Sequence, residues 1–172
     1  MADFFIMLYS LYHINSISPY QVIKDTEETV RFITDDGVEY MVAFIEDDNL
    51  EIDHAYQLVI SNISKTKTKG VDIKIGQTIA AIVNSFFIDN QNVLLFICDI
   101  SDSHQAARNR KFSSWFQQYA DLSNMMMETE VILVEDNAYF ISVIYCRNSG
   151  KALSVSQIFH SYIHDLKSKL DY

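Results

Sequence analysis

The residues best suited to chemistry lie in one short polar segment. It contains two carboxylates, an amide and a guanidinium, at Asp99, Asp102, Gln105 and Arg108. The apolar run at residues 93–98 precedes all four and lacks alternation, as expected of a strand that is buried on both faces. Polar groups where such a strand ends and a helix begins form a candidate site.

Helical spacing predicts that Arg108 points toward the protein core. Arg108 lies one turn before Phe112, in the same stripe as Phe116, and Gln105 belongs to that stripe too. A guanidinium on that face needs a carboxylate, because an unpaired buried charge is very costly. Asp99 and Asp102 are the nearest candidates in the sequence.

Two interpretations of this cluster stay open. In the structural one, which we favour, Asp99 pairs with Arg108 and Asp102 caps the helix, which fastens the strand to the helix. In the functional one, Asp99 and Asp102 hold a divalent cation and Arg108 stabilises a phosphate oxyanion. The functional interpretation predicts a small metal-assisted phosphoesterase or a nucleotide-binding enzyme.

Hydrophobic patterns and turn signals predict the elements around this cluster. Residues 30–34 and 38–45 form the best hairpin, because Asp36-Gly37 supplies the positive φ of a tight turn. A helix begins after the capping residue Asp72 and ends near Ile88. The remaining elements are a strand at 55–61, a helix capped by Ser101 or Asp102, strands at 129–135 and 138–146 joined by a turn at Asp136-Asn137, and a last helix opened by a capping box at Ser154.

This order of elements predicts an α+β fold in a single globular domain, residues 1–172. We expect a largely antiparallel sheet with three main helices packed on it, in the order ββββ-α-β-α-ββ-α. The helix that follows Asp72 could be a crossover between two parallel strands. The apolar spacing in residues 3–14 fits a helix and a strand equally well.

Composition excludes several classes of protein. With 49% apolar residues, 4 glycines and 1 proline, the chain is neither disordered nor collagen-like. A net charge of −10 repels phosphate backbones, so general nucleic-acid binding is not expected. Cys98 and Cys146 lie in apolar runs and are expected to be buried thiols. The amino terminus lacks a basic region and a membrane-length apolar run, which indicates a cytoplasmic protein without a membrane span.

Three further patterns have ordinary explanations. The acidic stretch at residues 47–53 lacks the glycine and glutamate of a calcium loop, so we expect a solvated loop. His160 and His164 have a zinc-compatible spacing but no HExxH motif, so we expect surface or half-buried histidines. The three methionines at 125–127 are expected to form a flexible connector with some core contacts.

The sequence also resembles a known family. The resemblance rests on residues 30–116, chiefly on the pattern CDxxDxxQxxRxxxFxxWF that starts at Cys98, and on the earlier hairpin. These features resemble a family of small uncharacterised bacterial proteins, which is classed as a domain of unknown function. The resemblance implies no activity.

The absence of a specific catalytic motif, together with the acidic charge, favours a non-enzymatic function. We expect an accessory, inhibitor or immunity-type protein that binds another protein through an acidic surface, without a cofactor. The first alternative is the phosphoesterase or nucleotide-binding enzyme described above. The second is a small-molecule sensor, which would need an apolar cavity with convergent polar groups.

Overall fold

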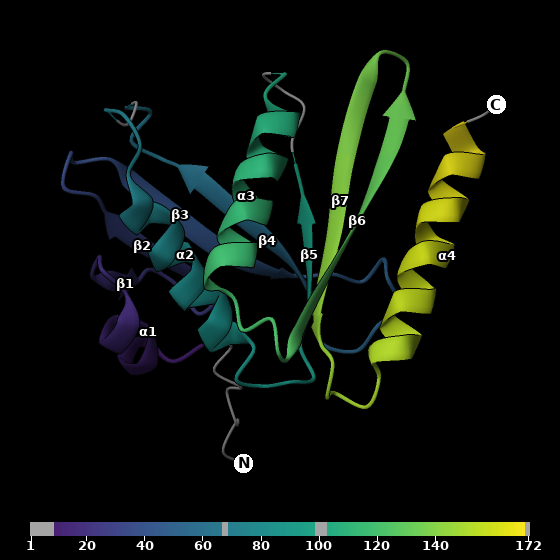
Figure 1. Cartoon of the computed structure of the whole chain (residues 1–172), viewed down its shortest axis with the longest axis horizontal. Coiled ribbons are helices and arrows are strands. Elements are labelled where there is room, and N and C mark those ends of the chain that lie inside the picture. The colour runs from purple at the N-terminus through teal and green to yellow at the C-terminus, as the bar shows by residue number, and fades with distance from the viewer. Residues whose placement is uncertain (1–8, 67–68, 99–102, 171–172) are drawn as a thin grey trace. The chain divides into compact units, whose positions relative to one another are not determined.

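The computed structural model describes residues 9–66, 69–98 and 103–170 (Figure 1). The elements are, in chain order, α1 (Leu11–Ile17), β1 (Val22–Lys24), β2 (Thr29–Ile33), β3 (Glu39–Glu46), β4 (Ala55–Asn62), α2 (Ile73–Phe86), β5 (Val93–Ile97), α3 (Gln105–Tyr119), β6 (Met125–Val134), β7 (Asn137–Cys146) and α4 (Ala152–Leu170). The structure thus has one more helix, α1, at the start of the predicted order. The apolar spacing in residues 3–14 had fitted a helix and a strand equally well.

The described strands form one mixed sheet in the order β1-β2-β3-β4-β5-β7-β6. Four of the described pairings are antiparallel, and β4 with β5 is parallel. The α+β class is therefore confirmed. The expected crossover is also confirmed, because α2 connects β4 to its parallel neighbour β5.

Two compact units make up the chain, residues 1–44 with 59–88, and residues 45–58 with 89–172. The prediction of a single domain over residues 1–172 stays a prediction. In the first unit, the β2–β3 hairpin turns at Gly37, whose φ is +76°. Asp72 caps α2 as expected, since its side chain accepts from the Lys74 N–H. Phe86 of α2 stacks on Phe44 of β3, with their ring centroids 4.4 Å apart.

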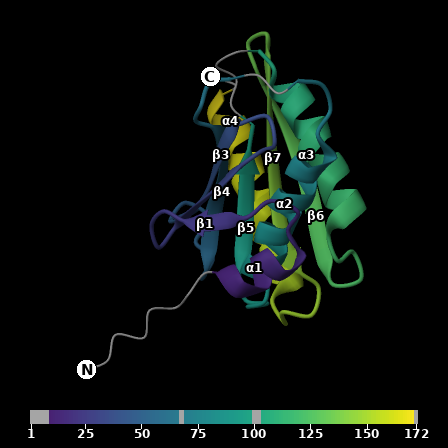
Figure 2. The same cartoon turned by 90° about the vertical axis from the view of Figure 1, so that its left-hand side faces the viewer.

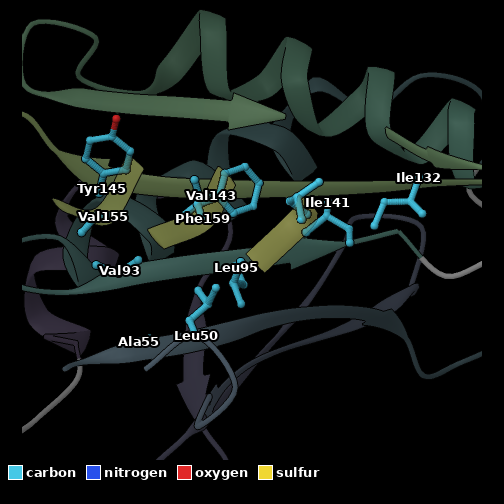
Figure 3. Close-up of a cluster of buried hydrophobic side chains, with 11 residues drawn as sticks. Leu50, Ala55, Val93, Leu95, Ile132, Ile141, Val143, Tyr145, Val155 and Phe159 are labelled. Carbon is cyan, nitrogen blue, oxygen red and sulfur yellow. The ribbon is translucent and has the colours of Figure 1, made fainter. Parts of the chain in front are cut away.

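The second unit has helices on both faces of β5 and β7. Val93 and Leu95 point to the face where Val155 and Phe159 of α4 pack (Figure 3). The alternate residue Phe96 stacks on Phe112 of α3, with their centroids 4.1 Å apart. Figures 1 and 2 show α3 and α4 on opposite sides of β7. The apolar run without alternation is thus a strand covered on both faces.

Three predicted boundaries were wrong. The predicted start of α3 is wrong, because the helix begins at Gln105, directly after His104, and the expected capping residues Ser101 and Asp102 lie outside the described residues. The capping box is also wrong, because α4 begins at Ala152 and Ser154 lies within its first turn. Residues 125–127 form no connector, because Met125 is buried and pairs with Cys146 at the start of β6.

Buried groups account for other features of the sequence. Both cysteines are buried free thiols, as expected. Asp47 is buried rather than solvated, and it accepts hydrogen bonds from the backbone of Asn49 and Leu50 and from the Gln57 side chain.

No helix in residues 9–66, 69–98 or 103–170 is long and apolar enough to cross a membrane.

The β6–β7 turn contains a strained residue. Val134 pairs with Asn137, so the loop has two residues, Glu135 and Asp136, rather than the predicted Asp136-Asn137. Glu135 has a φ of 53°, in the left-handed region that disfavours residues with a Cβ. Two-residue hairpin loops commonly place glycine there.

We expect Glu135→Gly to raise the free energy of unfolding by about 0.5–1 kcal/mol, because glycine adopts this φ without steric cost. Urea denaturation measures the change. Asp136→Gly is the matched control, since Asp136 does not have a positive φ, and it should lower stability or leave it unchanged. A loss of stability in Glu135→Gly equal to that of the control would contradict the explanation.

Candidate functional site

Only part of the predicted polar cluster lies in the described chain. Asp99 and Asp102 are outside the described residues, so the ion-pair and metal interpretations both stay predictions. Gln105 is buried at the start of α3, and Arg108 is half-buried one turn later. Arg108 lies near the end of β5, where its charge lowers the pKa of Cys98 although burial raises it overall, to about 11.

Within the described residues, two amide oxygens on α3 are buried without a hydrogen-bond partner. They are Oε1 of Gln105 and Oδ1 of Asn109, four residues apart and hence on one face of the helix. Asn109 was not among the predicted site residues. Among the described residues, no three His, Cys, Asp or Glu side chains lie close enough together to hold a metal ion.

A second candidate is the edge of the sheet formed by β6. This strand is last in the strand order, and β7 is its one partner among the described strands, through an unbroken register from Met125–Cys146 to Val134–Asn137. Figure 1 shows it as one arm of a long hairpin. Its ten residues contain no proline, glycine or lysine. Among the described strands, none lies on the other side of β6.

The register shows which backbone groups of β6 face outward. The Arg147 N–H donates to the Asn124 carbonyl at 2.6 Å, so these two residues bond across the hairpin. Every second residue of an antiparallel pair does so. The backbone N–H and C=O groups of even-numbered β6 residues therefore point toward β7. Those of odd-numbered residues point away from β7. A second bond agrees with this assignment. The Cys98 N–H donates to the Phe140 carbonyl at 3.1 Å, so the backbone groups of even-numbered β7 residues point toward β5 and those of odd-numbered residues point toward β6.

We define the β6 outer edge as Met127, Thr129, Val131 and Leu133. The amide of Met125 is excluded because it donates to the Asp121 carbonyl at 2.8 Å. Within the part of the chain that the structure describes, no group hydrogen-bonds the outward N–H and C=O groups of these four residues. Side chains of the same residues share one face of the sheet, on which Leu133 is 73% and Val131 is 40% exposed.

The opposite face of β6 carries a hydrogen-bonded carboxylate. Glu128 accepts from the hydroxyls of Tyr145 and Ser156, the latter at 3.1 Å, and its Oε2 lies 2.8 Å from Nε2 of His160. Two residues along β6, Glu130 accepts from Lys167 at 3.2 Å. Glu128 and Glu130 thus join β6 to one face of α4, where Ser156, His160 and Lys167 recur at helical spacing.

This arrangement is not a catalytic triad. Ser156 and His160 contact the same carboxylate instead of each other, so the described geometry gives the histidine no route to the serine proton. Burial alone raises the pKa of Glu128, but hydrogen bonds from Tyr145, Ser156 and His160 outweigh it, so the pKa lies below its usual value. Burial and the contact with Glu128 raise the pKa of Tyr145 to about 12. Glu128 is therefore a stable anion that anchors α4.

The sequence contains only a weak signal for these contacts. His160 and His164 are exposed, as expected for a pair without a zinc motif. The alternation of Glu128 and Glu130 marks one face of a strand, but sequence alone does not show that this face meets α4. Nor does it show that β6 is an edge, because periodicity does not determine strand order.

A cavity of about 350 Å³ lies in the second unit, at the amino end of α4. Its lining includes Glu51, Asp53 and Lys151, and the Lys151 ammonium donates to the Asp53 carbonyl at 2.9 Å. Burial lowers the pKa of Lys151, against the effect of nearby aspartates. Charges of both signs share the lining, so the cavity does not match the apolar pocket required by the sensor hypothesis.

We expect Glu128→Gln to lower the free energy of unfolding by about 1–3 kcal/mol at pH 7, because charge-assisted bonds to three donors are weakened. The native pKa is lowered, so this stabilisation is complete above the ordinary glutamate pKa of 4.5 and disappears as pH falls through the native pKa. Urea denaturation of both proteins across this range measures it.

The control is Glu27→Gln, because the Glu27 side chain is exposed. This substitution should change the free energy of unfolding little, both at pH 7 and in acid. A difference between wild type and Glu128→Gln that stays constant from pH 7 into acid would show that the carboxylate charge is not the stabilising feature.

One family model matches residues 71–163 and is described as a family of unknown function, DUF6169. The match covers more than half of the chain, and the protein belongs to this family. It includes all of β5, α3, β6 and β7, and therefore the β6 outer edge. No curated protein and no solved structure gave a significant match.

Proposed function

We propose that this member of the DUF6169 family is a protein-interaction module that binds an extended segment of a partner protein along the β6 outer edge. The observation that carries the proposal is the row of outward backbone groups on Met127, Thr129, Val131 and Leu133. An added strand would satisfy these groups with main-chain hydrogen bonds, as in known cases of strand addition.

The β6 edge lacks most of the features by which soluble proteins protect such a strand. Protective features include short length, proline, lysine and bulges. β6 is 10 residues long, has no proline or lysine, and keeps an unbroken register with β7. Exposed Val131 and Leu133 add apolar surface beside the outward groups. These properties favour a strand that has a partner over one that must avoid partners.

The other end of the strand order gives a useful comparison. β1 has three residues, and it contains Lys24, which is ion-paired with Glu27. That edge has both the short length and the lysine of a protected strand. One edge of the sheet is thus protected against an added strand and the other is not, which supports partner binding at β6.

The proposal fits the expected accessory, inhibitor or immunity-type role in the cytoplasm. A binding module of this kind needs neither a cofactor nor a catalytic residue. The acidic charge of the chain, −10, adds long-range attraction for a basic partner. The alternative enzyme, with Asp99, Asp102 and Arg108, gains no support from the described contacts.

We expect Val131→Pro to abolish strand addition without unfolding the protein. Proline removes the outward N–H of residue 131 and leaves the bonds to β7 in place, since proline is tolerated where an edge N–H faces solvent. Val131→Thr is the matched control, because threonine keeps the N–H and suits a strand. Circular dichroism and thermal melting verify that both variants fold.

The probe is a fluorescent peptide of about eight residues that alternates valine and threonine, with a soluble polyethylene glycol tail. Fluorescence anisotropy should show saturable binding to wild type and Val131→Thr, and binding at least about tenfold weaker to Val131→Pro. An N-methylated peptide, which lacks alternate N–H groups, should not bind. Equal binding to folded Val131→Pro, or no saturable binding to wild type below about 1 mM, would contradict the proposal.

A further inference from the structure

We infer that the segment added to β6 alternates basic and apolar side chains, with the basic ones facing Glu128 and Glu130. This inference rests on the proposed strand addition and states the partner's chemistry. Because side chains alternate between the faces of a sheet, an added strand presents one set of residues beside the glutamates and the other set beside Val131 and Leu133. The two faces of β6 therefore specify different side chains.

The glutamate face favours positive charge. Glu128 and Glu130 keep 20% and 32% of their side-chain surface exposed, so a residue on a neighbouring strand can reach them. Cross-strand side chains directly opposite each other have Cβ atoms about 4.5–5.5 Å apart, which suits an ion pair. Among the described side chains, the cations in contact with this pair are Lys167 and, when protonated, His160. With neutral His160, two carboxylates face one cation, which leaves a net negative charge.

The hairpin turn adds to that charge. Glu135 and Asp136 are exposed and follow directly after β6. A basic segment lying along the strand would therefore pass two acidic groups on the strand and two at its end. An acidic segment would face like charges throughout, which is destabilising for directly opposed residues.

The other face favours apolar side chains. Leu133 is 73% exposed and Val131 is 40% exposed, and both point away from the glutamates. Their cross-strand neighbours on β7 are Ala138 and Phe140, which are half-buried. A β-branched or aromatic side chain on the added strand would bury this apolar surface, as cross-strand pairs commonly do.

The same glutamates disfavour a second copy of this chain as the occupant. One antiparallel register pairs all four outer-edge residues with one another, Met127 with Leu133 and Thr129 with Val131. In that register Glu130 lies directly opposite Glu130 of the second copy, so like charges meet at the centre. Charged side chains on an edge strand are a known means of preventing self-pairing. A basic partner turns this repulsion into attraction.

Three peptides test the inference, each of about eight residues with valine at alternate positions, and with lysine, threonine or glutamate at the others. At low salt, the lysine peptide should bind wild type about threefold to twentyfold more tightly than the threonine peptide, and the glutamate peptide should bind most weakly. The ratio of lysine to threonine affinities should fall toward one at about 0.5 M salt, because salt screens exposed charges.

Glu130→Gln should reduce that ratio by about threefold and leave the threonine peptide unchanged. Asp36→Asn, an equal charge change in the first compact unit, is the control and should leave the ratio unchanged. Leu133→Thr should weaken binding of all three peptides, because apolar contact is lost on the other face.

The outcomes separate the inference from the proposed function. If no peptide binds, strand addition itself is wrong. If the threonine peptide binds as tightly as the lysine peptide, strand addition stands and the charge preference is wrong. A ratio that is insensitive to Glu130→Gln would also overturn the inference, because the preference would then come from overall charge. A dimer seen by sedimentation and removed by Val131→Pro would assign the edge to a second copy instead.

Discussion

Along β6, the backbone N–H and C=O groups of consecutive residues point alternately toward β7 and away from it, and the binding edge depends on this constraint. A strand can bond a neighbour on each side, and consecutive residues point their N–H and C=O groups to opposite sides. β7 occupies one side of β6 and satisfies the even-numbered residues. The odd-numbered residues from Met127 to Leu133 have no described hydrogen-bond partner on the other side. Water or another strand must therefore satisfy them.

The rest of the second unit holds this edge rigidly in place. α4 packs Val155 and Phe159 against β5 and β7, and Glu128 joins β6 itself to that helix through two hydrogen bonds, with Ser156 and His160. The strand therefore enters an interaction with its backbone already ordered, which reduces the entropy lost on binding. The same contacts place both glutamates on a single face, which gives the edge its charge preference.

Much of the architecture follows from local patterns in the sequence. The Asp36-Gly37 turn, the Asp72 cap and the uniformly apolar β5 strand each express one strong physical preference, and the structure confirms them. Weak or competing signals gave the errors. Met125 belongs to a strand, although methionine has little strand preference, because Cys146 pairs with it and the core buries it.

The candidate site was harder to predict than the fold. In the sequence, side chains that can do chemistry mark the predicted cluster of Asp99, Asp102, Gln105 and Arg108, and two of these four lie outside the described residues. The β6 outer edge consists of backbone groups, which every residue has, so no residue type marks it. Its position depends on strand order, which is set by long-range pairing and not by the alternation within one strand. The contacts of Glu128 likewise join residues that are far apart in the sequence.

Residue-resolved amide hydrogen exchange, measured by NMR on the isolated protein, tests the open edge most directly. An open β6 outer edge predicts alternating exchange along the strand, with slow exchange at Met126, Glu128, Glu130 and Ile132, whose amides bond to β7, and fast exchange at the four outer-edge amides. Slow exchange at Met127, Thr129, Val131 and Leu133 in the free protein would show that these groups already have partners, and would contradict the account.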